Sequence, residues 1–303
     1  MTRPFAITRI LAPTDLGPST IPALRYARLL ADRFAANLTI LYSDPVIYPI
    51  DVVGPSVFIV PAPEQEARLR SEVDQYAARV PGTGPYDVRI TSGRPVPAIL
   101  QFAKEQGTDL IVVGTHLLHG WRRAILGSVS DGVLYGSQCP VLTVASDDRP
   151  LPAHVDTIKT VLCPINFTGV ARESLHAAAR LAQVFGADLL VVHVIEPGES
   201  TDVQADERRV QQWISEEVEG TCTYRELIMR GSAAERVLDC AEDAGAGLIV
   251  VGAQHKLFRN ATVIGTTADR LIRFASCPVF VMPRQAVAAE KGQREAEPVV
   301  AQW

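Results

Sequence analysis

The stretch that decides the fold is Leu110–Ser128, which reads LIVVGTHLLHGWRRAILGS. Its first four residues are apolar and partly β-branched, and such a run predicts a strand that is buried on both faces. We expect this strand to end at Gly114, a loop with polar residues and glycine to follow, and a helix to begin at Gly127–Ser128. The backbone N–H groups of the loop and of the first helical turn would point to one place. The stretch therefore predicts a strand, a loop and a helix start that together can bind an anion.

The same arrangement returns later in the chain. Leu248–Val251 is a second apolar run, and Gly252 follows it directly. Gly114 precedes Gly127 by 13 positions, and Gly252 precedes Gly265 by the same 13 positions. Two copies at one spacing indicate an internal duplication, which must be recognised before any fold is assigned.

The duplication covers most of the chain. Pro13 returns as Pro164 at an offset of 151, whereas from Gly93 and Gly231 onward the offset is 138. The first half therefore carries about 13 extra residues, which we place in the proline-bearing stretch Asp44–Glu64 and expect to be an irregular surface excursion. Its apolar residues would cover the neighbouring half or a second chain.

Each half is predicted to alternate five strands with four helices. The strands are expected near residues 7–12, 38–43, 86–91, 110–114 and 140–145, and again near 158–163, 189–195, 222–228, 248–252 and 278–282. Helices near 19–36, 64–80, 95–106 and 128–136 would connect the strands of the first half. Most of the strands are continuous apolar runs, which are typical of a parallel sheet with helices on both faces.

We expect two domains, residues 1–146 and 153–283, with a polar, proline-bearing joint between them. Residues 284–303 have no apolar stripe wide enough to pack, so this tail is expected to be mobile.

Composition limits the class of protein. A net charge of −5 argues against a broad nucleic-acid surface, and no apolar run approaches the roughly 18 residues of a membrane span. The first strand is expected near Ile7, which leaves no room for a signal peptide. The five cysteines, which form no CxxC pair, predict buried thiols in a reducing compartment. They are Cys139, Cys163, Cys222, Cys240 and Cys277. The chain is therefore predicted to be cytoplasmic, with no nucleic-acid or membrane partner.

As a set, these segments resemble the universal stress protein family in its tandem two-domain form. The resemblance rests on Pro13-Thr14-Asp15, Gly114-Thr115-His116, Gly127-Ser128 and Cys139-Pro140-Val141, and on Pro164, Gly252, Gly265-Thr266 and Cys277-Pro278-Val279 in the second half. It covers roughly residues 5–146 and 155–283. It implies two doubly wound, Rossmann-like five-stranded domains of strand order 3-2-1-4-5, packed as a pseudo-dimer through their fifth strands. It also implies ATP or another adenine nucleotide at the point where the strand order reverses.

The resemblance assigns binding residues to both halves. In the first half they are Pro13, Thr14, Asp15, Ser43, Gly114, Thr115, His116, Gly127, Ser128, Val129 and Ser130, and in the second half Val194, Gly252, Gly265, Thr266 and Thr267. Asp15 would accept hydrogen bonds from ribose hydroxyls, and Asn166 replaces it in the second half. Ser43 and Val194 would lie against the adenine through their backbones.

Both halves depart from the family's pattern Gly-x2-Gly-x9-Gly-Ser/Thr. Its second glycine position holds Leu117 in the first half and His255 in the second. A side chain there can block the close approach of phosphates or forbid a positive φ. Because the first half keeps Asp15, binding is expected there more than in the second half.

Other interpretations of these residues stay open. Gly114 and Gly252 could serve only as tight turns after strands, and Asp15 could cap the helix that follows it. Arg122 and Arg123, like Lys256 and Arg259, could reach a phosphate or lie in solvent. His116 and His119 could suggest a metal, but the sequence offers no third ligand, so no metal site is predicted.

Three functions are compatible with this sequence. The first is an adenine-nucleotide-binding sensor or regulator of the stress response, whose bound state alters contacts with a protein partner or a second copy. The second is a scaffold of the same fold that has lost nucleotide binding, which Leu117, His255 and Asn166 favour. The third is a weak ATP hydrolase. A dedicated enzyme is not expected, because the chain has no GxSxG, no GxxxxGK[ST] and no HExxH motif.

Overall fold

Strands and helices alternate through both halves of the chain. The computed structural model describes residues 5–44, 63–117, 124–125, 127–146, 158–198, 203–218, 220–253 and 265–283. The strands of the first half are β1 (Arg9–Thr14), β2 (Asn37–Asp44), β3 (Tyr86–Ser92), β4 (Leu110–Leu117), β5 (Ala124–Ile125) and β6 (Val141–Ser146). Its helices are the short 3-10 helix η1 (Pro18–Thr20), α1 (Ile21–Phe34), α2 (Pro63–Ala77), α3 (Pro95–Glu105) and α4 (Ser128–Gly136).

The second half repeats this order. Its strands are β7 (Thr160–Ile165), β8 (Asp188–Ile195), β9 (Tyr224–Arg230), β10 (Leu248–Gly252) and β11 (Val279–Met282). Its helices are α5 (Gly169–Phe185), α6 (Val203–Val218), α7 (Ala233–Asp243) and α8 (Thr266–Phe274). Apart from η1 and β5, these are the elements that the sequence predicts.

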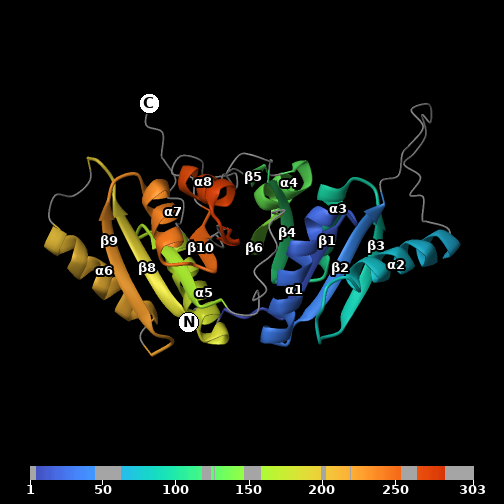
Figure 1. The fold of residues 1–303 in the computed structure, drawn as a ribbon, viewed down its shortest axis with the longest axis horizontal. Coiled ribbons are helices and arrows are strands. Elements are labelled where there is room, and N and C mark those ends of the chain that lie inside the picture. Colours follow the sequence, from blue (N-terminus) through green and yellow to red (C-terminus); the bar gives the residue numbers. More distant parts are fainter. Residues whose placement is uncertain are drawn as a thin grey trace, which may run out of the picture.

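One sheet runs through both halves, in the order β3-β2-β1-β4-β6-β11-β10-β7-β8-β9 (Figure 1). The short strand β5 lies outside this order and pairs with β4. With β6 and β11 as the fifth strands, each half has the predicted order 3-2-1-4-5. These five strands are parallel within each half, because every β-α-β crossover returns the chain to the same end of the sheet. The predicted doubly wound α/β fold is confirmed.

The two halves meet where β6 pairs with β11 in antiparallel register (Figure 1). Phe280 lies opposite Leu142, and Val279 lies opposite Thr143. The Thr143 hydroxyl donates to the Val279 carbonyl at 3.2 Å, and the Phe5 ring meets the Phe280 ring edge-on with centroids 6.0 Å apart. Pairing of the two edge strands leaves neither exposed and gives the predicted pseudo-dimer.

The sheet is buried on both faces. Helices α1, α2, α5 and α6 cover one face and share a single apolar cluster with it, whereas α3, α4, α7 and α8 cover the other. Successive strand residues alternate between the two clusters, as Ile10 and Leu11 do in β1 and Val161 and Leu162 do in β7. This double burial explains why the strands read as continuous apolar runs.

One predicted boundary is wrong, because β4 does not end at Gly114 but runs to Leu117. Its parallel register with β6 continues from Gly114 opposite Val144 to His116 opposite Ser146. The backbone of β5 then pairs with His116 and Leu117 in antiparallel register. The ladder that β6 and β5 offer keeps the chain extended, so the loop begins later than the glycine suggested.

Several expectations lie outside the described residues. These are most of the Asp44–Glu64 excursion, the joint between the domains and the tail 284–303. None of the described helices is long and apolar enough to cross a membrane. All five cysteines are described and unpaired.

Candidate functional site

A cavity lies at the carboxyl ends of the second-half strands. Its volume is about 630 Å³, within the usual range of roughly 300–1,000 Å³ for small-molecule sites. The ends of β7, β8 and β10 border it together with the beginning of α8 and one face each of α6 and α7. The cavity is thus centred where the strand order reverses between β7 and β10, the place where doubly wound sheets bind ligands.

The fold brings all predicted residues of the second half to this cavity. Val194, Gly252, Gly265, Thr266 and Thr267 line it, and so do Pro164 and Asn166. They come from β7, β8, β10 and the start of α8, four segments far apart in the sequence. His255, Lys256 and Arg259 lie outside the described residues.

The predicted residues of the first half occupy the corresponding strand ends. Thr14 ends β1, Ser43 is the penultimate residue of β2, and Gly114, Thr115 and His116 belong to β4. Pro13 precedes Thr14, Asp15 follows it, Gly127 caps α4, and Ser128, Val129 and Ser130 form its first turn. Gly120, Arg122, Arg123 and His119 lie outside the described residues, as does the side chain of His116.

Several first-half side chains already have partners. The Ser130 hydroxyl donates to the Gly114 carbonyl at 2.6 Å, and the Ser43 hydroxyl donates to the Gly93 carbonyl at 3.0 Å. The Thr14 hydroxyl accepts the Leu16 N–H at 2.9 Å. These three hydroxyls hold the loops at the strand ends in place.

The helices α4 and α8 begin in the same way. Each N-cap is a glycine in extended conformation, with φ −63° and ψ 157° at Gly127 and φ −65° and ψ 154° at Gly265. Glycine has no side chain to cap the helix, so in the described part of the chain no side-chain oxygen at the N-cap satisfies the N–H groups of the first turn. The start of α8 borders the cavity, and its N–H donors and the positive end of the helix dipole favour an anion there.

Neither Gly114 nor Gly252 has a positive φ, so neither needs to be glycine for a left-handed backbone. A Cβ atom on Gly114 would lie 2.8 Å from the backbone oxygen of Ser19. A Cβ atom on Gly252 would lie 2.6 Å from Val170 Cγ1. Both glycines allow the fourth strand of each half to approach the segment that begins its first long helix, and for Gly114, which lies inside β4, the interpretation as a turn after the strand is wrong.

Asp15 does not cap the helix that follows it. Helix α1 begins at Ile21 with Thr20 at its N-cap and no side-chain cap bond. Instead, Asp15 Oδ1 accepts the Gly17 N–H at 2.8 Å and the Thr20 hydroxyl at 3.4 Å. The carboxylate therefore organises its own loop through Oδ1, and Oδ2 accepts no hydrogen bond from the described residues.

The second half organises the same loop differently. Asn166 Oδ1 accepts the Thr168 hydroxyl at 2.7 Å. Thr168 is the N-cap of α5, where its hydroxyl accepts the Ala171 N–H at 3.3 Å. Asn166 is exposed, which leaves its amide free to turn toward a ligand in the cavity.

The residue after Asp15 and Asn166 is one feature that the sequence does not announce. Leu16 and Phe167 both adopt the left-handed conformation, with φ of 62° and 58°. This conformation is uncommon for residues other than glycine and costs about 1–3 kcal/mol. Strain at the same position of both loops marks the two as equivalent candidate sites.

Phe167 also builds an aromatic wall that sequence reasoning missed. Its ring lies 4.6 Å from the His193 ring and 5.6 Å from the Trp213 ring, between centroids. The Arg209 guanidinium lies over the Phe167 ring, 4.0 Å from its centroid, and Arg209 also lines the cavity. His193 Nδ1 is 3.0 Å from the Ile165 carbonyl, so a neutral ring donates from Nδ1 and keeps Nε2 as an acceptor. The only feature of the sequence that could have indicated these contacts is a histidine, His193, in an otherwise apolar strand.

Acidic groups border the cavity on the β8 side. Asp206, in the first turns of α6, lines the cavity and is only 8% exposed. Its Oδ2 is buried and accepts no hydrogen bond from the described part of the chain. Glu196, which follows β8, accepts the Ala233 N–H at 3.3 Å.

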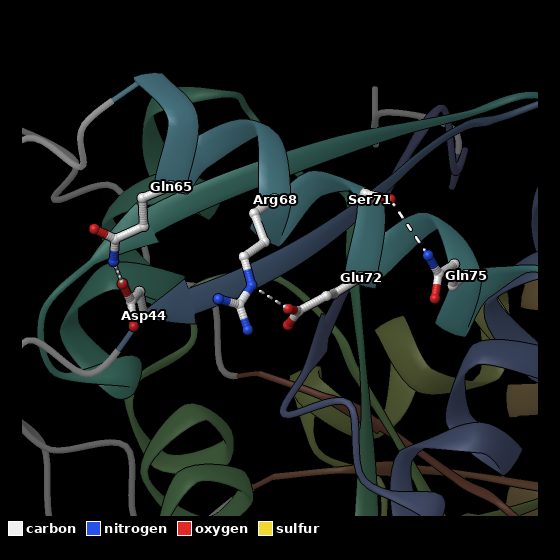
Figure 2. A network of polar contacts seen from close by, with 6 residues as sticks. All are labelled: Asp44, Gln65, Arg68, Ser71, Glu72 and Gln75. Carbon is white, nitrogen blue, oxygen red and sulfur yellow. Dashed lines mark hydrogen bonds and ion pairs between the residues drawn. The ribbon is translucent and has the colours of Figure 1, made fainter.

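The matching region of the first half has paired side chains instead. Asp44 at the end of β2 accepts a hydrogen bond from Gln65 at 3.0 Å, and Arg68 pairs with Glu72 at 3.0 Å (Figure 2). Within the described ranges no three His, Cys, Asp or Glu side chains gather as a metal site would require.

Comparison with known proteins identifies relatives of this chain. The universal stress protein family matches it twice, over residues 6–145 and 157–283. A universal stress protein of Methanocaldococcus jannaschii is 32% identical over 152 residues, which are 45% of this chain and 81% of that protein. One from Mycobacterium tuberculosis is 25% identical over 202 residues, 62% of this chain and 65% of that protein. The crystal structure of a universal stress protein from Archaeoglobus fulgidus superposes with a TM-score of 0.70 at 25% identity, covering 91% of this chain and 98% of that one.

Proposed function

This chain belongs to the universal stress protein family, and we propose that it acts as a stress-response regulator that binds an adenine nucleotide. The proposal places the protein in a reducing compartment, the cytoplasm, where five unpaired cysteines are expected. Binding, rather than turnover, would be its working step.

The observation that carries the proposal is the cavity at the switch point of the second half. It is bordered by Thr266 and Thr267 of the first turn of α8 and by Val194 near the end of β8. Phosphate groups would be bound by the N–H donors of α8, because a helix N-terminus is an anion site. The ribose would meet Asn166 at the end of β7, and the base would lie toward β8.

The first half is proposed as a second site of the same kind. Asp15 keeps one carboxylate oxygen without a partner among the described residues, and that oxygen is a strong acceptor for a ribose hydroxyl. The Gly127 cap of α4 has nearly the dihedral angles of Gly265. The proposal therefore covers both halves, and the experiment must separate them.

The test begins with the nucleotide content of the purified chain. The protein is denatured, the supernatant is separated by anion exchange, and the stripped chain is titrated with ATP, ADP and AMP by calorimetry. Release of about one or two adenine nucleotides per chain, and rebinding in the titration, is the expected result.

Two paired variants locate the sites. Thr267→Glu places a carboxylate in the first turn of α8, and Val129→Glu does so at the corresponding position of α4. A negative charge in the first turn favours the helix, so the fold should survive, whereas like charge would weaken phosphate binding by several kcal/mol. Each variant is the control for the other, and Asp15→Ala tests the ribose contact in the first half.

Lack of released nucleotide and lack of heat at millimolar ATP would refute the proposal. The scaffold interpretation would then stand, because Leu117 and His255 would indeed close both sites. Steady release of ADP from ATP that disappears in Asp15→Ala would instead support the weak hydrolase.

A further inference from the structure

The most unusual group in the cavity is the Asp206 carboxylate. A buried carboxylate oxygen without a hydrogen bond is costly, since desolvation of an ionised group is offset only by partners. The exposed fraction of Asp206 is only 8%, and its Oδ2 atom has no hydrogen-bond partner in the described chain. A group of this kind in the wall of a cavity lacks a hydrogen-bond donor that a ligand can supply.

The fold does not require a carboxylate at this position. Asp206 precedes the fully buried Val210 of α6 by four residues. In the first half, Leu69 precedes the fully buried Val73 of α2 by the same four residues. An apolar side chain therefore suits this place in the packing of the second helix, and the acid in α6 needs another explanation.

The cavity has opposite chemical character at its two sides. The sheet order β10-β7-β8 puts β7 between the β10 side, where α8 begins, and the β8 side, where Asp206 and Glu196 lie. The α8 side offers N–H donors to an anion, and the β8 side offers carboxylate acceptors. A ligand that matches both has a phosphate at one end and a hydrogen-bond donor at the other.

We infer that Asp206 accepts a hydrogen bond from the exocyclic amino group of the bound base and thereby selects adenine over a 6-oxo purine. This inference rests on the proposed nucleotide binding and places it in the second half. With phosphates at α8, the base reaches the β8 side, where the Asp206 carboxylate accepts a hydrogen bond from the amino group. A 6-oxo group would instead turn an oxygen toward the carboxylate, and two acceptors repel each other.

The experiment compares ATP with ITP, which carry an amino group and an oxo group, respectively, at position 6 of the purine. Kd values are measured by calorimetry on the stripped full-length chain carrying Val129→Glu, so that the second half alone reports. A hydrogen bond to a charged group corresponds to roughly 10- to 150-fold in affinity. We expect ATP to bind that much more tightly than ITP.

The variant Asp206→Asn keeps the shape of the side chain and replaces one acceptor with an amide donor. It should reduce the preference for ATP to about unity or reverse it, because the amide can donate to the 6-oxo oxygen. Glu207→Gln is the matched control, since Glu207 is the exposed neighbour on α6 and loses the same charge. It should leave the ratio unchanged. Thermal unfolding followed by circular dichroism verifies that both variants fold.

The outcomes separate the inference from the proposal on which it rests. Equal affinity for ATP and ITP, or a preference that survives in Asp206→Asn, overturns the role of Asp206 while nucleotide binding stands. Lack of binding of either nucleotide to the Val129→Glu chain overturns the second-half site and with it the role of Asp206, whereas nucleotide binding as such is overturned only if the unsubstituted chain also binds neither. A large preference for ATP that only Asp206→Asn removes supports the inference.

Discussion

The substitution Gly114→Ala tests how the fourth strand is packed. A Cβ atom at this position would lie 2.8 Å from the backbone oxygen of Ser19 and 3.4 Å from the Cα atom of Thr20. Neither contact can be relieved by rotating a side chain, because both atoms belong to the backbone. Either η1 must move away from β4 or β4 must shift from its register with β6.

Overpacking of this kind costs about 1–3 kcal/mol. Because the φ of Gly114 is not positive, the cost does not include a left-handed backbone. A loss of about 2 kcal/mol corresponds to a fall in Tm of roughly 4–8 °C for a domain of this size. Urea unfolding followed by circular dichroism at 222 nm measures the free energy directly.

Gly169→Ala is the matched control. Gly169 is exposed at the first position of α5, and a Cβ atom there would meet nothing within 4 Å. Its replacement should leave the stability unchanged or raise it by about 0.4–1 kcal/mol, since alanine restricts the unfolded chain. If Gly114→Ala is as stable as Gly169→Ala, the close approach of β4 and η1 is not what requires glycine, and the reasoning fails.

Two further predictions concern the interface and the response to pH. Phe280→Ala, at the fully buried junction of the two halves, should lower the free energy of unfolding measured in urea by about 3–5 kcal/mol. Leu227→Ala is the control, and because Leu227 is exposed, it should change this free energy by less than about 0.5 kcal/mol. Similar losses in the two variants would contradict a packed interface. Glu173→Gln should stabilise the protein at neutral pH, because burial raises the pKa of Glu173, against an opposing effect of His176, and leaves its Oε2 without a partner in the described chain. A carboxyl whose folded pKa is raised loses stability as the pH rises from its ordinary value through its folded value, so the advantage of the variant should vanish below about pH 4. If Glu173→Gln and the unsubstituted protein have equal urea midpoints at neutral pH as well as at acidic pH, the reasoning is refuted.

The fold could be predicted from the sequence because its signals are local and occur twice. The apolar runs Leu110–Val113 and Leu248–Val251 fix buried strands, and the constant interval to Gly127 and Gly265 fixes the helix starts that follow. The pairing of the fifth strands was implied by the resemblance to the family, and the apolar run Val279–Met282 agrees with it, because an apolar edge strand must be covered.

The site could be predicted only in part. The carboxyl ends of parallel strands gather at one edge of the sheet whatever their side chains, so Val194, Gly252 and Thr266 could be placed together in advance. The end of β4 could not be predicted, because it depends on how far β6 and β5 extend beside it. The need for glycine at position 114 could not be predicted either, since Ser19 is distant in sequence and meets Gly114 only in the folded chain.

The sequence by itself determined the repeat, the order of strands and helices along the chain, and the edge of the sheet where the candidate site lies. Only the tertiary structure decided that Phe167 takes a left-handed conformation against His193, and that Asp206 is buried at the cavity without a partner. The physical reason is that periodicity encodes which residues face the core. Whether a charged group on a helix finds a partner depends on neighbours that the fold brings from other segments.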